Sequence, residues 1–314
     1  MLWPRPLPHG GTIGICSPAG PSGTGAIPMA VSALERRGFR VVVAPHAEAQ
    51  HPDYPYLAGT VQQRLSDLNG LLQDPGIDLI LAARGGYGSA QLLDGIDYAA
   101  LRNDPKPVVG YSDITALNLA FAAQAGVVSF SGIMATAGDG FGEESLDPFS
   151  EASFFSAVQT AGAARVFTQP NDAPLTLHQG SPQPEGRLFP VCLSLLESLA
   201  STRYIPELTG ALLLIEDVSE ELYAVDRALT QLRLSGVLAR LSAVLIGSFN
   251  GWKDERDTLL ERGLPPLVCS LVPEQVTVVS GVVYGHIPRR FTLPVGARAA
   301  VDVPAGTITT LVEF

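Results

Sequence analysis

One serine in this chain lies where a nucleophile would be well supported. In the stretch Gly110-Tyr111-Ser112-Asp113-Ile114-Thr115, Ser112 follows an apolar run at 107–109 and opens a pattern typical of a helix. A sharp strand-to-helix turn holds a serine Oγ outward at the carboxyl end of a sheet, beside backbone N–H groups. Ile114 occupies the place of the second glycine in G-x-S-x-G, so this stretch alone does not establish catalysis.

A serine nucleophile needs a base, and one of the five histidines is well placed for that role. His286 follows the apolar run Val282-Val283-Tyr284-Gly285, and Pro288 then breaks the chain. Side chains at strand ends project into clefts, which makes His286 the candidate base. A lone histidine in such a place is more often structural, so this assignment needs other evidence.

The remaining histidines have no rigid support in the pattern. They lie in Pro/Gly-rich segments or in a polar loop with two acidic residues: His9, His178, His46 and His51, with Glu48 and Asp53. The loop has no H-x-x-x-H spacing and no distant third ligand, so we expect solvated loop and no metal site.

An acid that orients the base is predicted at the end of the apolar run Ala211–Ile215. Glu216 and Asp217 follow this run directly, and a carboxylate that ends a buried strand is costly unless it has a partner. We expect Asp217 to cap the helix that carries Tyr223. Glu216 points the opposite way and is then free to meet a histidine.

A glycine-rich stretch, Arg84-Gly85-Gly86-Tyr87-Gly88, follows another predicted strand. Gln91 lies where the third glycine of G-x-G-x-x-G would fall, so dinucleotide binding fits poorly. If this loop faces Ser112 from an adjacent strand, the backbone N–H groups of Gly86 and Asp113 would form an oxyanion hole.

The totals limit the class of protein. At 314 residues the chain exceeds what one core usually serves, so we expect two domains. A net charge of −11 argues against nucleic-acid binding, and the absence of about 18 consecutive apolar residues argues against a membrane span. The three cysteines, Cys16, Cys192 and Cys269, show no C-x-x-C pairing. They predict neither disulfides nor zinc, as in a reducing cytoplasm.

The first half alternates short apolar runs with helical spacing, which predicts an α/β fold with a doubly wound parallel sheet. The predicted strands are Thr12–Cys16, Phe39–Ala44, Ile77–Ala83, Val108–Tyr111 and Val127–Phe130. We expect residues 1–165 to form this domain, 166–186 to be a Pro-rich linker, and 187–314 to form a smaller mixed α/β domain. The second domain's predicted elements are a helix at Val191–Leu199, a strand at Ala211–Ile215, a helix at Tyr223–Leu234, and strands at Ala243–Phe249, Val276–Val283 and Ala299–Val303.

Taken together, and in this order, the motifs resemble those of the LD-carboxypeptidase family of serine peptidases, which includes immunity peptidases against microcin-C-type antibiotics. The match spans nearly the whole chain. It rests on Ser17-Pro18-Ala19-Gly20, Arg84–Gly88, Gly110–Thr115, Ile215-Glu216-Asp217 with Tyr223 and Asp226-Arg227, and Gly285-His286 before Leu293-Pro294 and Gly296.

The resemblance implies that Ser112 is the nucleophile, His286 the base and Glu216 its partner. It also implies a first domain like that of class I glutamine amidotransferases, an active site at the domain junction, and a homodimer. One departure is Pro190-Val191-Cys192, which stands where the family commonly carries Gly-Gly-Asn and opens the question of a different cleft wall.

The resulting hypothesis is a cytoplasmic serine carboxypeptidase that cleaves the bond before the terminal D-alanine of murein tetrapeptides, without metal or organic cofactor. Arg84, Arg289 and Arg290 are candidates for binding substrate carboxylates, with Arg84 and Arg289 preferred. The alternatives are a peptidase of peptidyl-nucleotide amides, which base-stacking aromatic residues would favour, and a catalytically silent module that binds murein fragments.

Overall fold

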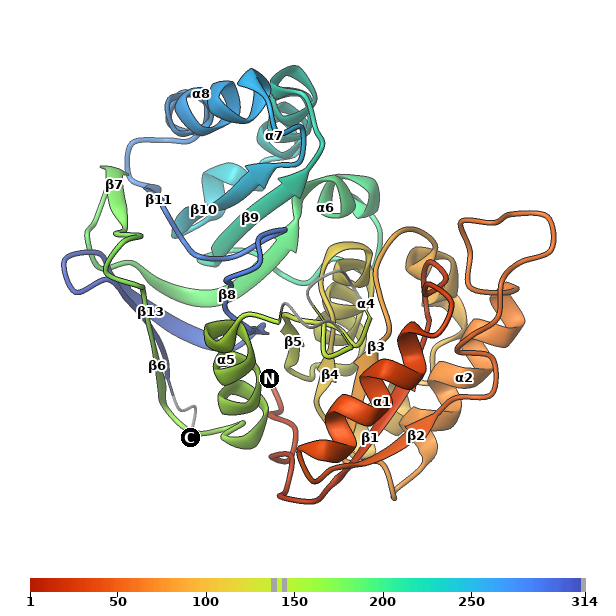
Figure 1. The fold of residues 1–314 in the computed structure, drawn as a ribbon. Coiled ribbons are helices and arrows are strands. Elements are labelled where there is room, and N and C mark those ends of the chain that lie inside the picture. Colours follow the sequence, from red (N-terminus) through yellow and green to blue (C-terminus); the bar gives the residue numbers. More distant parts are fainter. Residues whose placement is uncertain (137–139, 143–145, 312–314) are drawn as a thin grey trace.

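Two β-sheets organise the molecule, each in its own lobe (Figure 1). The computed structural model describes residues 1–136, 140–142 and 146–311. This architecture confirms the predicted α/β class with two domains. In the described residues, no helix combines the length and apolar composition needed to cross a membrane.

The first sheet has the strand order β12-β5-β4-β3-β1-β2, and all its pairs are parallel except β12 with β5. Short runs of Val, Ile and Leu form its centre because such strands are buried on both faces. The strands are β1 (Thr12–Cys16), β2 (Arg40–Val43), β3 (Leu79–Ala82), β4 (Val108–Val109), β5 (Ser129–Ser131) and β12 (Leu293–Val295).

Helices connect these strands: α1 (Ala26–Arg36), α2 (Val61–Gln73), α3 (Tyr98–Asn103) and α4 (Thr115–Ala120), with short helical turns η1 (Ser89–Gly95), η2 (Ser112–Ile114) and η3 (Phe121–Ala125). The chain visits β2 on one side of β1 and then β3 on the other. In open sheets of this kind, ligands lie beyond the carboxyl ends of the strands at such a reversal. The loops after β1 and β3 are therefore the expected walls of a site.

The second sheet has eight strands in the order β6-β14-β13-β8-β9-β10-β11-β7, of which β8 to β11 are parallel. Its strands are β6 (Arg165–Thr168), β7 (Thr176–Gln179), β8 (Glu185–Cys192), β9 (Leu212–Val218), β10 (Ala243–Asn250), β11 (Thr277–Ser280), β13 (Arg298–Asp302) and β14 (Thr307–Thr310). The helices of this half are α5 (Pro148–Gln159), α6 (Leu193–Leu199), α7 (Leu222–Leu234) and α8 (Glu255–Leu271), with the short η4 (Leu238–Arg240).

The two lobes exchange segments of chain. Residues 166–186, predicted as a linker, supply most of β6 and all of β7, which are the two edges of the second sheet. In the other direction, β12 leaves the second half and pairs with β5 of the first sheet. Proline and glycine hide the period of such short edge strands, which is why the pattern there indicated a linker.

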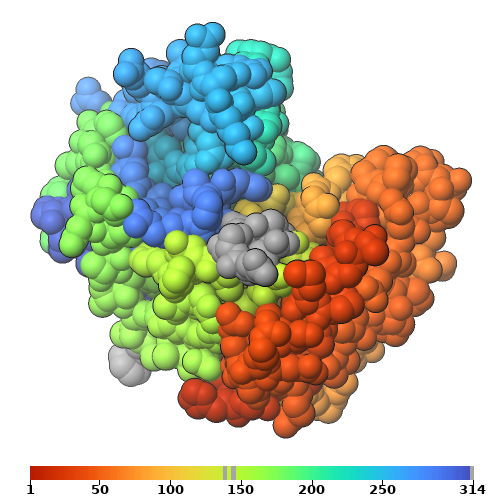
Figure 2. Space-filling model, viewed as in Figure 1, coloured from red at the N-terminus to blue at the C-terminus, as the bar shows by residue number. Residues whose placement is uncertain are grey.

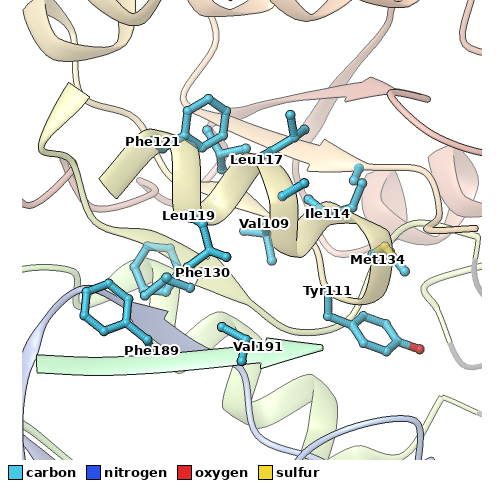
Figure 3. Packing of buried hydrophobic residues seen from close by; sticks show 14 of the residues in the cluster. Val109, Tyr111, Ile114, Leu117, Leu119, Phe121, Phe130, Met134, Phe189 and Val191 are labelled. Atoms are coloured by element: carbon cyan, nitrogen blue, oxygen red, sulfur yellow. The ribbon is translucent and has the colours of Figure 1, made fainter. Parts of the chain in front are cut away.

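Apolar packing joins the lobes. Leu119 of α4 and Phe130 of β5 belong to the same buried cluster as Phe189 and Val191 of β8 (Figure 3). The helix predicted from Val191 instead begins at Leu193, because β8 extends to Cys192. The end of β8 therefore lies directly against the helix that follows Ser112.

Candidate active site

Ser112 lies on a sharp turn between β4 and α4. Its backbone φ of 61° is in the left-handed region, which side-chain-bearing residues adopt at a cost and which recurs at functional sites. Gly110 permits the turn, because a Cβ there would lie 2.8 Å from Ile114 Cγ2 and 3.0 Å from Ala82 Cβ. Asn118 Nδ2 donates to the Gly110 carbonyl oxygen at 2.9 Å and holds the turn closed. The strand-to-helix turn predicted for this serine is therefore present.

The glycine-rich loop after β3 lies against this turn. A Cβ on Gly85 would lie 3.0 Å from Ser112 Oγ and 3.3 Å from the Asp113 nitrogen. Asp113 ties the two together: its carboxylate accepts the Ser89 N–H at 2.8 Å, and its carbonyl accepts the Ser89 hydroxyl at 2.6 Å. Burial raises the pKa of the Asp113 carboxyl, and the bonds from Ser89 oppose that rise. Gly86 and Asp113 thus belong to one rigid unit beside Ser112.

Arg64 of α2, which the sequence reasoning missed, fixes the same loop from behind. Its side chain is buried, and it donates to the carbonyl oxygens of Pro18 at 2.9 Å, Gly59 at 3.2 Å and Gly88 at 2.8 Å. Burial lowers the pKa of this guanidinium. Because those carbonyls belong to three separate loops, Arg64 holds the loops after β1 and β3 together. Helical spacing could not reveal it, since Arg64 lies in an ordinary amphipathic pattern.

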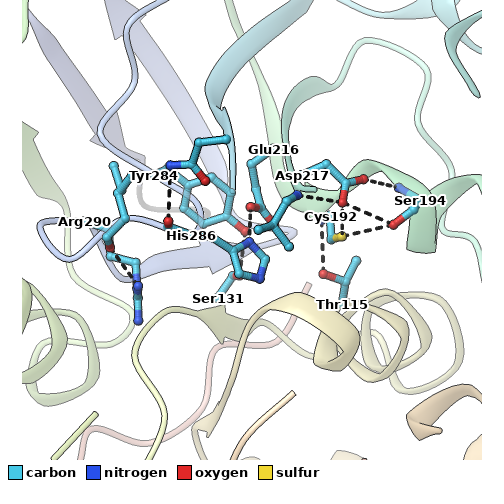
Figure 4. A network of polar contacts seen from close by, with 12 residues as sticks. Thr115, Ser131, Cys192, Ser194, Glu216, Asp217, Tyr284, His286 and Arg290 are labelled. Atoms are coloured by element: carbon cyan, nitrogen blue, oxygen red, sulfur yellow. Dashed lines mark hydrogen bonds and ion pairs between the residues drawn. The ribbon is translucent and has the colours of Figure 1, made fainter. Parts of the chain in front are cut away.

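Glu216 and His286 form a hydrogen-bonded pair (Figure 4). His286 Nδ1 lies 2.6 Å from Glu216 Oε2, and the Glu216 side chain is fully buried. Burial raises the pKa of the Glu216 carboxyl, while the hydrogen bond from His286 opposes the rise. Gly285 makes this approach possible: its φ is +120°, and a Cβ there would lie 3.0 Å from Glu216 Oε2. The strand predicted to end before Glu216 runs on to Val218.

Ser112 and His286 line one cavity of about 290 Å³. Figure 2 shows the surface hollowed between the two lobes. The walls come from the loops after β1, β3, β4 and β5 and from the segment after β11: Gly23, Arg84, Gly85, Gly86, Tyr111, Ser112, Met134, Thr136 and His286. The fold therefore brings together a serine, a histidine paired with a carboxylate, and an arginine from distant parts of the chain.

The three candidate arginines are placed differently. Arg84 lines the cavity and donates to the Pro21 carbonyl oxygen at 3.2 Å. Arg289 donates to both carboxylate oxygens of Asp172, at 2.9 and 2.8 Å, and does not line that cavity. Arg290, also a candidate for binding a substrate carboxylate, is fully buried with its guanidinium over the Tyr111 ring.

Asp217 does not cap the helix of Tyr223 as predicted. Its carboxylate accepts the Ser194 N–H at 2.8 Å and so caps the first turn of α6, whereas Glu221, the residue that precedes α7, makes no side-chain cap. The register of β8 with β9 sets this choice, because it pairs Cys192 with Glu216 and brings the start of α6 to Asp217. The Cys192 N–H donates to Thr115 Oγ1 at 3.2 Å. This bond links Pro190-Val191-Cys192, the run that differs from the Gly-Gly-Asn pattern, to the helix after Ser112.

The fold is a two-domain α/β architecture, and the cavity between its lobes presents a serine and a histidine paired with a carboxylate, the side chains that serine peptidases use. The chain belongs to the LD-carboxypeptidase family: the family's N-terminal domain matches residues 13–132 and its C-terminal domain matches residues 185–301. These matches confirm the resemblance seen in the motifs, and members of the family are peptidases.

Named relatives and solved structures agree with that membership. A Bacillus subtilis protein named "Probable murein peptide carboxypeptidase" is 33% identical over 97% of this chain and 92% of its own. A Pseudomonas aeruginosa murein tetrapeptide carboxypeptidase is 31% identical over 90% of this chain and 88% of its own. The structure of MccF in complex with glutamyl sulfamoyl guanosine superposes with a TM-score of 0.86 at 26% identity, covering 100% and 99% of the two chains.

Proposed function

We propose that this protein is a cytoplasmic serine carboxypeptidase that hydrolyses the bond before the terminal D-alanine of murein tetrapeptides. The observation that carries the proposal is the bond of 2.6 Å between Glu216 and His286, at a cavity that Ser112 also lines. A buried carboxylate bonded to Nδ1 leaves Nε2 as the basic nitrogen, which is the arrangement a serine nucleophile requires. The named relatives in Bacillus subtilis and Pseudomonas aeruginosa support the substrate class.

The proposed mechanism needs only this chain's own groups. His286 accepts the Ser112 proton as Oγ attacks the carbonyl carbon, and Glu216 stabilises the imidazolium that forms. The N–H groups of Gly86 and Asp113 stabilise the oxyanion. His286 then protonates the departing D-alanine amine, and water releases the acyl-enzyme by the reverse sequence. No metal or organic cofactor takes part in these steps.

Arg84 is the proposed ligand of the substrate's terminal carboxylate. It lines the cavity, whereas Arg289 is engaged with Asp172. A cation at this place offsets the repulsion between an acidic substrate and a protein of net charge −11. With the carboxylate held there, Ser112 reaches the carbonyl one residue inward, which gives carboxypeptidase rather than endopeptidase activity. By family resemblance, we also propose that the protein acts as a homodimer.

Mass spectrometry of products from a murein tetrapeptide tests the proposal directly. The expected products are the tripeptide and free D-alanine, and Ser112→Ala should abolish them, since loss of a triad serine costs about 10⁴-fold or more in kcat. A serine-directed phosphonate probe should label wild type at Ser112. Labelling without hydrolysis of any peptide would favour another substrate, and no labelling would favour a silent binding module.

A second candidate, hydrolysis of peptidyl-nucleotide amides, is favoured by aromatic residues near the cavity. Tyr87 follows Gly86 of the cavity wall, and its ring centroid lies 5.8 Å from that of Tyr56. The two side chains are 55% and 54% exposed, which leaves ring surface available for a base. The structural match to MccF with glutamyl sulfamoyl guanosine points the same way. Parallel assays with an aminoacyl sulfamoyl nucleoside and a tetrapeptide decide between the two.

A further inference from the structure

The ring of Tyr111, the residue directly before Ser112, contacts both a guanidinium and an imidazole. The guanidinium carbon of Arg290 lies 4.2 Å from the ring centroid, and the His286 ring centroid lies 4.9 Å away at an interplanar angle of 56°. Tyr111 is 5% exposed and Arg290 is 0% exposed. Cations over an aromatic face are attracted by the ring quadrupole, and the attraction is strongest where water is excluded.

Arg290 also closes the turn that carries His286. Its Nη1 donates to the Ile287 carbonyl oxygen at 2.8 Å. Its backbone N–H donates to Ser150 Oγ at 2.8 Å, and that hydroxyl donates to the Pro288 carbonyl oxygen at 2.8 Å. The turn after His286 is thereby anchored both to itself and to α5, and the same side chain reaches the residue before Ser112.

These contacts restrict the orientation of the His286 ring, which the hydrogen bond to Glu216 alone does not fix. One hydrogen bond at Nδ1 fixes a single point of the imidazole but leaves its plane free to tilt about that point. Ser112 begins η2, which follows β4 of the first sheet, whereas His286 follows β11 of the second sheet. Holding Nε2 toward Ser112 therefore needs a contact that crosses between the lobes, and the Tyr111 ring against His286 is such a contact.

We propose that Arg290 and Tyr111 are positioning residues, which set the orientation of the His286 imidazole relative to Ser112. This inference rests on the proposed triad. It gives Arg290 the role of orienting His286 toward Ser112 and not that of binding substrate. Because Arg290 does not line the cavity, its loss should lower kcat and leave KM nearly unchanged. Tyr111 does line the cavity, so the split between kcat and KM is assessed on the Arg290 variants. A misplacement of about 1 Å can cost roughly 100-fold in rate.

The first experiment compares Arg290→Met with Arg290→Lys. We expect Arg290→Met to lower kcat by about 10- to 100-fold with KM within about threefold, and Arg290→Lys, which keeps a cation over the ring, to recover part of the loss. The matched control is Arg165→Met, because Arg165 lies over the Phe167 ring at 5.1 Å and does not line the cavity. A rise in KM at unchanged kcat would instead make Arg290 a substrate ligand and overturn the proposal.

A double-mutant cycle tests whether the two residues act as one device. Tyr111→Leu should lower kcat as Arg290→Met does, and the double variant should lose little more than either single variant. Losses that multiply would show independent roles and overturn the proposal. If circular dichroism shows that Arg290→Met is unfolded, Tyr111→Leu and Arg290→Lys carry the same comparison.

Labelling of Ser112 by a small serine-directed phosphonate separates this inference from the substrate assignment. The probe has no peptide to bind, so its rate should fall in the same proportion as kcat in each variant. If wild type is labelled but cleaves no tetrapeptide, the proposed substrate is wrong, and the labelling rates still decide the role of Arg290. Equal labelling rates in wild type and Arg290→Met would overturn the positioning role.

Discussion

Gly85 and Ser112 lie so close that a Cβ on Gly85 would be 2.9 Å from the Ser112 Cβ. Real Cβ contacts essentially never reach that distance, so a side chain at Gly85 must displace the serine or its turn. The glycine after Arg84 is thus needed for close approach of two backbones. This relationship also explains why a glycine-rich stretch follows β3 although it binds no dinucleotide in the proposed function.

Gly85→Ala should therefore lower kcat/KM by about 100-fold while the protein remains folded, because the reacting atoms shift by a fraction of an ångström or more. Gly70→Ala is the control, since a Cβ at Gly70 of α2 would meet nothing within 4 Å. Steady-state assays with both variants, alongside thermal unfolding, measure the effect. Activity of Gly85→Ala equal to that of Gly70→Ala would show that the loop yields to the methyl group.

Glu216→Gln should lower kcat strongly, by about 10²- to 10⁴-fold, because a neutral amide no longer stabilises the imidazolium. Assays across pH on wild type and variant measure this loss. The observation that would count against the triad is a variant that retains more than about a tenth of wild-type kcat in a folded protein.

The same substitution has the opposite expected effect on stability. Burial raises the pKa of Glu216 above the unfolded value of about 4.3. At a pH between the unfolded and the raised pKa, the native state therefore holds a proton that the unfolded chain has released. Wild type therefore loses stability relative to Glu216→Gln as the pH rises from about 4 through the raised pKa. Urea unfolding of both proteins at acidic and neutral pH should show that the free energy of unfolding of the variant increases relative to that of wild type as the pH rises. A constant difference between them would refute the raised pKa.

Arg84→Gln tests recognition of the substrate's terminal carboxylate. In wild type, a tetrapeptide ending in D-alanine should have a kcat/KM about tenfold or more above that of its D-alanine amide, because only the former pairs with the guanidinium. The variant should discriminate little between the two peptides, with the loss confined mainly to KM. If wild type hydrolysed D-alanine, L-alanine and D-alanine amide peptides equally well, the carboxypeptidase assignment would fail and the nucleotide amide would become the leading substrate.

Lys106, which does not line the cavity, makes a second contribution to the pH dependence of stability. Its ammonium is fully buried and donates to the Asp74 carbonyl oxygen at 2.6 Å, and burial lowers its pKa to about 8. Since an unfolded lysine titrates near pH 10.4, the unfolded chain binds more protons between these two values. Wild type should gain stability relative to Lys106→Met as the pH rises through this window. Urea unfolding at pH 7.5 and pH 10 measures the difference in the free energy of unfolding. A wild type that loses stability relative to the variant over this range would contradict the lowered pKa.

Much of the fold was predictable from local pattern. Five of the six strands of the first sheet, β1 to β5, were expected within a few residues, because each overlaps a short apolar run. The elements missed include the edge strands β6 and β7 inside the expected linker, the strands β8, β12 and β14, and the helices α5 and α8, of which α8 contains Pro265 and Pro266. Short strands beside prolines take their conformation from the strand they pair with, so their own residues carry little signal.

By itself the sequence determined the residue types that could do chemistry and the turn on which Ser112 lies. A glycine two residues before a serine, at the end of an apolar run, defines that turn through steric limits within one short stretch. It also carried the motifs by which the family is identified. These features are local in the chain, so no knowledge of distant contacts is needed to find them.

Only the tertiary structure decided which of these residues meet. Glu216 reaches His286 because the parallel pairing of β9 with β10 and of β10 with β11 brings two segments 70 residues apart to one edge of the sheet. Burial then distinguishes the three arginines: Arg84 reaches the cavity, Arg289 binds Asp172, and Arg290 is buried with its guanidinium against the Tyr111 ring. The partners and the burial of each charged side chain depend on how the two lobes pack. The energy of a charge depends on both, so the spacing of residues in the sequence cannot predict it.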